Sequence, residues 1–287
     1  MSRCFFASDL HGHRNRYEKL FERLRAERPQ VLLLGGDLTP NPFVQAKLDS
    51  WPPEDFFAWL AGKFDALRKD LGSEAPRVLL IMGNDDLRVE ETVVEAAAAR
   101  GSWEYLHMRR VLLDDGDPVY GYACVSPSPF LLKDWERYDV SRYVDPGCVS
   151  PEEGSRSVPV TADEARYGTI QKDLDELTGS DALEQALFLF HAPPYKSKLD
   201  RAALDGKMID HVPLDVHVGS IAIQRFIEKR QPKITLHGHI HESASITGAW
   251  QDQIGRTHCF SAAHDGPELA LVEFDTEQPD QARRRLL

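Results

Sequence analysis

The sequence predicts an α/β fold built on a sheet of buried, mainly parallel strands. Five short apolar runs, each followed within two residues by a Gly, an Asp or a His, are typical of strands that are covered on both faces. Amphipathic helices separate the first three runs, and this alternation predicts right-handed parallel crossovers. The runs lie at residues 4–7, 31–34, 78–81, 187–190 and 234–236.

The first third of the chain alternates strand with helix. Residues 14–28 carry apolar side chains at helical spacing, and Pro29 marks the end of this helix. Residues 39–53 are rich in Pro, Asn and Asp, which predicts a loop. Two further helices are expected at residues 56–71 and 90–100, each followed by a glycine.

The middle of the chain changes character from about residue 105. Residues 111–113 and 119–125 are β-rich, and the turn 114–117 between them predicts a hairpin. Residues 126–160 hold five prolines among charged and aromatic residues, and we expect an irregular insertion close to the site.

The last part of the chain returns to regular elements. Helices are expected at about 161–178 and at 220–230, and a meander of strands at 243–275. Residues 276–287 have few apolar side chains, which predicts a flexible tail. We therefore expect one domain over residues 1–275.

Composition indicates an ordinary globular protein. The 287 residues are enough for a large core, and 42% are hydrophobic and 28% charged. The net charge of -12 argues against nucleic acid or membrane as the main partner. Without a leader, a membrane-length apolar run or paired cysteines, we expect a cytoplasmic protein with reduced thiols. The cysteines are Cys4, Cys124, Cys148 and Cys259.

Five polar signatures follow the apolar runs. Side chains just past the ends of parallel strands meet at one edge of the sheet, where α/β proteins place their sites. Carboxylate, imidazole and amide groups together suit divalent Mn, Fe or Zn. The signatures are Asp9-Leu10-His11, Gly36-Asp37, Gly83-Asn84-Asp85, His191 and Gly238-His239-Ile240-His241.

The five signatures, in this order, resemble the calcineurin-like metallophosphoesterase superfamily. The resemblance spans residues 9–241, nearly the whole chain, and segments 191–195 (HAPPY) and 217–220 (HVGS) are similar to a bacterial subgroup of small phosphoesterases. It implies a four-layer αββα sandwich of two mixed β-sheets. It also implies two divalent metal ions, with Mn preferred and Fe, Zn or Ni as alternatives.

The resemblance assigns the ligands position by position. One metal would be held by Asp9, His11, Asp37 and His241. The other would be held by Asp37, Asn84, His191 and His239, so that Asp37 is shared. A bridging hydroxide between metals about 4 Å apart would then attack phosphorus.

One position departs from the family pattern. The family usually has His after Gly-Asn, close to the leaving group, and this chain has Asp85 there. An ionised Asp85 is a poor proton donor and repels phosphate oxygens. We expect slower turnover, or a substrate whose leaving group needs less help. Asp85 could contact the substrate, contact a metal ligand or form a turn, and we favour the last two.

Three further candidates stay open. His217 stands before a helix start, where it could bind an anion or donate a proton, or be a solvated residue before the N-cap Ser220. Arg14 could contact substrate or lie on the solvent face of its helix. Four residues of the insertion could form a substrate wall or pack the loop down. They are Trp135, Arg137, Tyr138 and Arg142.

These residues predict a dinuclear metal-dependent phosphodiesterase acting on a small, nucleotide-like substrate. A monoesterase remains an alternative if water or His217 supplies the proton. A different class, a binding or scaffold protein with weak catalysis, is favoured by Asp85 and opposed by the complete ligand set. The oligomeric state, the pathway and the native metals stay open.

Overall fold

The computed structural model describes residues 2–40 and 55–287. The loop expected at 39–53 therefore lies almost wholly outside the described residues. The first sheet has the order β14-β13-β1-β2-β3-β4. Its strands β1, β2 and β3 run parallel as expected, and the short β4 adds a fourth parallel strand that was not predicted. Its strands are β1 (Arg3–Ala7), β2 (Val31–Gly35), β3 (Arg77–Ile81), β4 (Glu104–Tyr105), β13 (Ala270–Asp275) and β14 (Arg283–Leu286).

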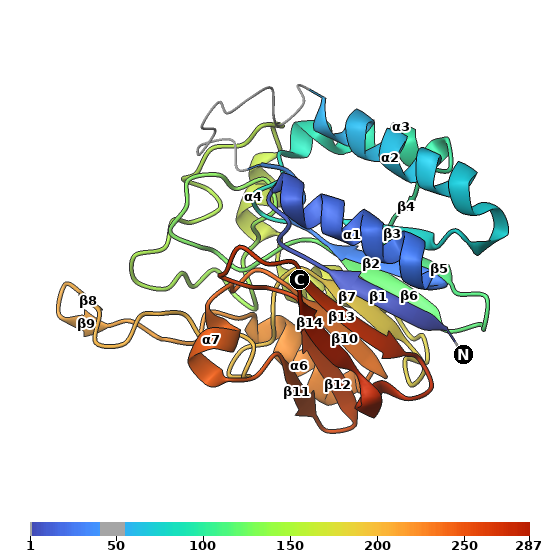
Figure 1. The fold of residues 1–287 in the computed structure, drawn as a ribbon. Helices are drawn as coiled ribbons and strands as arrows, with labels where there is room; N and C mark the ends of the chain where they lie inside the picture. The colour runs from blue at the N-terminus through green and yellow to red at the C-terminus, as the bar shows by residue number, and fades with distance from the viewer. Residues whose placement is uncertain (1, 41–54) are drawn as a thin grey trace.

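The second sheet is also six-stranded and mixed. Its order is β11-β12-β10-β7-β6-β5, with antiparallel strands at both edges. A separate two-stranded hairpin, β8 (Met208–Ile209) with β9 (Val212–Pro213), projects from the body (Figure 1). The strands of the second sheet are β5 (Arg109–Leu112), β6 (Pro118–Tyr122), β7 (Leu187–Phe190), β10 (Ile234–His237), β11 (Gln251–Ile254) and β12 (Thr257–Ser261).

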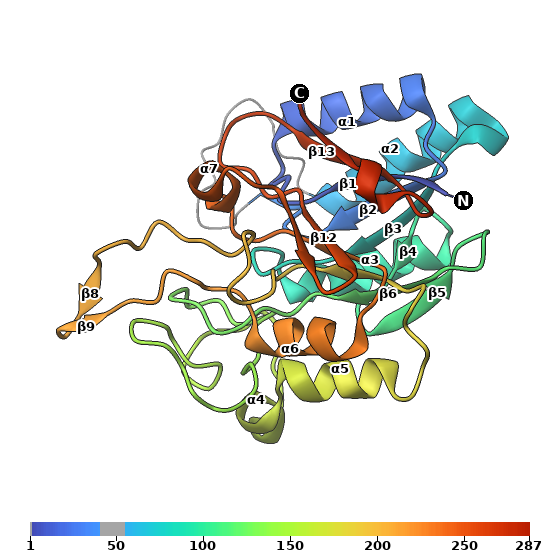
Figure 2. The ribbon, with the colours of Figure 1, turned by 90° about the horizontal axis from the view of Figure 1, so that it is seen from below.

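Helices cover the outer face of each sheet, which gives the four-layer αββα sandwich (Figure 2). Three of them lie on the side of the first sheet: α1 (Arg14–Glu27), α2 (Phe56–Leu71) and α3 (Glu91–Ala99). The second sheet is covered by α5 (Ile170–Thr178) and α6 (Ile221–Arg230). The short elements are α4 (Ala162–Tyr167), α7 (Ser243–Thr247), η1 (Gly72–Glu74), η2 (Arg88–Glu90) and η3 (Pro279–Gln281). No helix among the described residues is long and apolar enough to cross a membrane.

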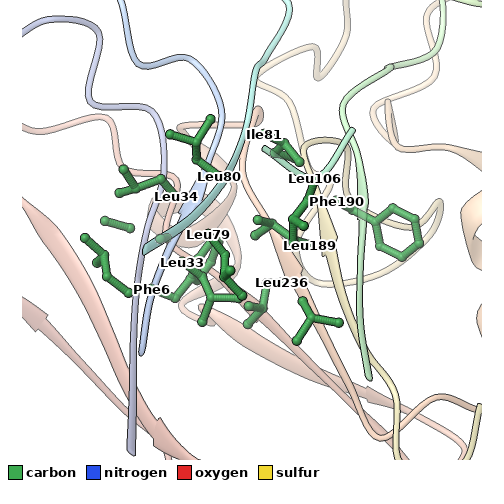
Figure 3. Packing of buried hydrophobic residues seen from close by; sticks show 14 of the residues in the cluster. Phe6, Leu33, Leu34, Leu79, Leu80, Ile81, Leu106, Leu189, Phe190 and Leu236 are labelled. Carbon is green, nitrogen blue, oxygen red and sulfur yellow. The ribbon is translucent and has the colours of Figure 1, made fainter. Parts of the chain in front are cut away.

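The core lies between the two sheets. Leu33 and Leu79 from the first sheet and Leu189 and Leu236 from the second are fully buried in it (Figure 3). Burial of this extent, at roughly 25 cal/mol per Å² of apolar surface, holds the central strands in place. The loops that leave their carboxyl ends therefore start from a rigid base.

Two local expectations need correction. The helix expected at about 161–178 is two helices, because Thr169 caps α5 and Gly168 ends α4. The expected strand meander begins with the helix α7. The hairpin after residue 105 is confirmed, with Leu112 paired to Pro118.

The C-terminal segment also differs from the expected flexible tail. Its residues Arg283–Leu286 form β14, which pairs antiparallel with β13. Arg285 makes ion pairs with Glu27 and Glu273, and Arg284 donates to the Ala263 carbonyl at 2.6 Å. The sequence offers few apolar residues here, and the strand is held by ladder hydrogen bonds and by these cations instead.

Candidate metal centre

The loops after five central strands bring the polar signatures to one edge of the sandwich. Two groups of side chains result, and in each group the donor atoms all lie within 4.8 Å of one another. The side chain of Asp37 belongs to both groups. The first group is Asp9, His11, Asp37 and His241, and the second is Asp37, His191 and His239.

Four of these residues have a left-handed backbone. The φ angles are 56° at Asp9, 45° at His11, 51° at Asp37 and 73° at His239. A non-glycine residue in this region is uncommon, costs of order 1 kcal/mol or more, and such strain gathers at functional sites. The residue types and spacing of the signatures gave no sign of this backbone geometry.

Glycines leave the space that the carboxylates occupy. A Cβ on Gly83 would lie 2.3 Å from Asp37 Oδ1, and a Cβ on Gly238 would lie 2.5 Å from Asp9 Oδ2. Gly36, with φ at 91°, would place a Cβ 2.7 Å from the backbone of Gly83. The glycines of the signatures therefore allow the loop after β3 to approach the loop after β2, and the loop after β10 to approach the loop after β1.

Hydrogen bonds orient the donors. The Nδ1 atom of His191 lies 2.7 Å from the Gly35 carbonyl, so this nitrogen carries a proton and Nε2 points into the centre. Asn84 Oδ1 lies 3.0 Å from that Nε2 atom, which adds an amide oxygen to the second group. In the first group, His241 Nε2 lies 3.0 Å from His11 Nε2 and 3.2 Å from Asp9 Oδ1.

The charges at the centre depend on one another. Burial alone would lower the pKa of His191, but Asp37, Asp9 and the Gly35 carbonyl outweigh it and raise that pKa to about 10. Burial alone would raise the pKa of Asp37, but His191 and His11 hold it down at about 2. Burial and the positive charge of His191 lower the pKa of His239 to about 3.

The residues present fit divalent cations. Asp9 is buried, and its Oδ2 atom has no hydrogen-bond partner among the described residues. A buried carboxylate oxygen without a partner is costly, and a cation would satisfy it. Carboxylate and imidazole donors are the ligands that borderline divalent metals select.

Two acidic residues follow Asn84. Asp86 is buried and accepts hydrogen bonds from Leu38, Thr39 and Gly83, so it ties the loop after β2 to the loop after β3. The backbone N–H of Asp85 donates to Asp37 Oδ1 at 2.8 Å. The partly exposed Asp85 carboxylate lies 3.6 Å from His11 Nδ1, at the rim of the centre.

The N-terminus of α6 already holds an anion. Asp139, from the insertion, accepts hydrogen bonds from the backbone of Ile221 and Ala222 and from the Ser220 hydroxyl. Ser220 is the N-cap, as one alternative expected. A ligand anion bound at this helix end is therefore excluded, and His217 is not simply solvated, because it bonds Asp200.

The two arginines at the start of α1 have different surroundings. Arg14 is exposed and pairs with Glu18 at 2.7 Å, which agrees with the solvent-face alternative. Arg16, which the sequence analysis overlooked, is buried and donates to the Asp9 carbonyl at 2.5 Å and to the Gly266 carbonyl at 2.6 Å. Arg16 thereby fixes the strained turn at Asp9, and no sequence signal distinguished it.

The four residues of the insertion pack it against the rest of the protein and do not form a surface for substrate. Trp135 is buried and donates to the Asp86 carbonyl at 2.8 Å. Arg137 pairs with Glu164 and Asp173, while Tyr138 and Arg142 both bond Glu152. These contacts agree with the packing alternative, and Trp135 links the insertion to the loop that carries Asn84.

Comparison with known proteins identifies the class. The family model of calcineurin-like phosphoesterases matches residues 2–243, so the chain belongs to this family. Its members are metal-dependent phosphoester hydrolases. A search of the curated proteins finds no match.

Solved structures share the fold. One crystal structure is 13% identical, with a TM-score of 0.59, and the match covers 99% of this chain and 98% of the other. The crystal structure of TT1561 of Thermus thermophilus is 16% identical, with a TM-score of 0.56 and the same coverage. Likeness at this level of identity concerns the fold alone.

Cation binding is expected to release a proton. In the metal-free protein His191 is protonated at neutral pH, because its pKa is raised to about 10. A cation needs the neutral imidazole, so its affinity rises about tenfold per pH unit for one proton released. Calorimetry in buffers of different ionisation enthalpy counts that proton. A dissociation constant that stays the same between about pH 6 and 8 would contradict the expectation.

Proposed function

We propose that the protein is a dinuclear metal-dependent phosphodiesterase that acts on a small, nucleotide-like substrate. The observation that carries the proposal is the presence of two donor groups that share Asp37. One cation, for which Mn is the first choice, would be held by Asp9, His11, Asp37 and His241. The other would be held by Asp37, Asn84, His191 and His239.

The protein groups prepare the site before any substrate arrives. When bound, the two cations supply Lewis-acid stabilisation of phosphoryl oxygens and a water of lowered pKa. The Gly35 carbonyl holds the His191 ring in one tautomer, and Asp86 locks the two loops that carry Asp37 and Asn84. A site fixed in this way needs little reorganisation during the reaction.

A diester fits the charge of the site better than a monoester. A phosphomonoester at neutral pH carries close to two negative charges, whereas a diester carries one. The Asp85 carboxylate at the rim repels the more highly charged group more strongly. The net charge of -12 acts in the same direction at longer range.

Substituting Asp85 with Asn tests this charge argument. We expect the KM for p-nitrophenyl phosphate to fall about fivefold more than the KM for bis-p-nitrophenyl phosphate, since one charge pair in water-like surroundings is worth about 1 kcal/mol. Steady-state kinetics with both esters measures the difference. The exposed Asp175→Asn variant on α5 is the matched control, and equal changes for the two esters would refute the argument.

The activity itself is tested with metal-stripped protein. Mn, Ni, Fe or Zn is restored, and hydrolysis of bis-p-nitrophenyl phosphate is compared with that of p-nitrophenyl phosphate. The proposal expects metal-dependent turnover that is faster with the diester. Binding of two cations without turnover of either ester would favour the binding or scaffold protein instead.

A further inference from the structure

A buried carboxylate and an imidazole lie outside the two donor groups, in a part of the chain that contacts the segments after His191 and His241. Asp200 is fully buried, and its Oδ1 atom lies 2.7 Å from His217 Nδ1. The His217 side chain keeps 26% of its surface exposed. Neither residue belongs to a donor group or to the hydrophobic core.

The carboxylate is held in place on several sides. Asp200 Oδ2 accepts hydrogen bonds from the backbone N–H groups of Lys196 at 2.9 Å and Gly219 at 3.2 Å. A Cβ on Gly219 would lie 2.8 Å from Asp200 Cβ, so only glycine fits there. These contacts give the glycine of the 217–220 segment a structural purpose.

The imidazole is held as well. The backbone N–H of His217 donates to Asp215 Oδ1 at 2.9 Å, and the Tyr195 hydroxyl donates to Asp215 Oδ2 at 2.6 Å. The Tyr195 ring meets the His217 ring edge to face, with centroids 6.2 Å apart. His217 is therefore fixed from both sides.

The dyad, Asp200 with His217, lies between two chain segments that leave the candidate centre. The first follows His191: the Ser220 N–H donates to the Pro193 carbonyl at 2.9 Å. The second follows His241: the Arg201 N–H donates to Ser243 Oγ at 3.0 Å, and Arg201 pairs with His217 in a β-bridge. Both segments start two residues after a candidate ligand.

The dyad has the arrangement of an acid–base catalyst. Asp200 accepts the proton on Nδ1, so Nε2 is the atom that exchanges a proton, and it makes no hydrogen bond within the described part of the chain. A buried carboxylate that orients a partly exposed imidazole is a recurrent device of proton transfer. Asp85, at the rim of the centre, cannot donate a proton when it is ionised.

We propose that His217 donates the proton to the leaving group and that Asp200 positions it. An oxygen from water forms a bond to phosphorus and its proton passes to solvent, while the bond between phosphorus and the leaving oxygen breaks. The electron pair of that bond goes to the leaving oxygen, which takes the proton from Nε2. Water then returns a proton to the imidazole. The substrate class is a phosphodiester whose leaving group is a poorly acidic alcohol or phenol, such as a nucleoside hydroxyl.

This inference rests on the proposed function. Varying the acidity of the leaving group distinguishes the proton-donor role of His217 from the phosphodiesterase activity itself. The rate at which the metal-loaded protein hydrolyses a methyl aryl phosphate is measured with p-nitrophenol and with unsubstituted phenol as the leaving group. A nitrophenolate leaves without a proton, whereas phenolate needs one. General acid catalysis contributes about 10²–10⁴-fold.

The variants are His217→Gln and Asp200→Asn, with the exposed His211→Gln as the matched control. For both dyad variants we expect the phenyl-to-nitrophenyl rate ratio to fall by at least about tenfold relative to wild type. Metal content and thermal unfolding are measured on each variant to confirm that the site and fold persist.

Three outcomes overturn the inference in different ways. Equal slowing of both esters in His217→Gln would show a structural role only. An unchanged ratio in Asp200→Asn would remove the positioning role of this residue. Absence of turnover of the nitrophenyl ester in wild type would overturn the proposed function, and the proton donor with it.

Discussion

Replacing Asp37 with Asn is expected to abolish hydrolysis. The residue is buried and belongs to both donor groups, so the substitution removes the shared carboxylate from each. Loss of several kcal/mol of stabilisation corresponds to a rate at least about 10³-fold lower. Metal analysis should show fewer than two cations per chain, since even partners of metal ligands change affinity by about 10–100-fold.

The Asp175→Asn variant makes the same chemical change on the exposed face of α5. It should keep both the activity and the metal content of the wild type. An Asp37→Asn protein that still binds two cations and turns over at more than about a tenth of the wild-type rate would show that Asp37 is not shared.

Gly83→Ala is expected to disrupt the centre almost as severely. The added methyl group would lie 2.3 Å from Asp37 Oδ1, 2.4 Å from the Asp37 nitrogen and 2.7 Å from His191 Cε1. The backbone nitrogen of Asp37 cannot move away without a large cost in energy, so the side chains of Asp37 and His191 must shift. Misplacement by about 1 Å costs about 100-fold in rate, and isothermal titration with Mn should show weakened binding.

The control for Gly83→Ala is Gly62→Ala. Gly62 lies within α2, and a Cβ there meets nothing within 4 Å. Alanine at an exposed helix position is expected to stabilise the fold by about 0.5–1 kcal/mol. If both variants keep full metal affinity, the close packing of Gly83 against Asp37 is not needed for metal binding.

The fold was predictable from the sequence where burial of a strand determines the pattern of apolar residues. Strands covered on both faces need continuous apolar runs, and all five expected runs are central strands of the two sheets. The edge strand β14 was not predictable in this way. It contains three arginines, and its place depends on ion pairs with Glu273 in the neighbouring strand β13 and with Glu27, which is distant in sequence.

The candidate site was predictable as a set of residue types at strand ends. The structure brings those side chains together, and their role as ligands remains our proposal. Three features arise only from folding. They are the left-handed backbone at Asp9 and Asp37, the buried Arg16 that holds the Asp9 turn, and the pairing of His217 with Asp200.

The number of metal ions per active chain tests the central claim most directly. Metal-stripped protein is titrated with Mn while hydrolysis of bis-p-nitrophenyl phosphate is recorded, and bound metal is counted by mass spectrometry. Two donor groups that share Asp37 predict that activity reaches its maximum at two bound ions per chain. Full activity with one bound ion, or hydrolysis without any metal, would contradict the account.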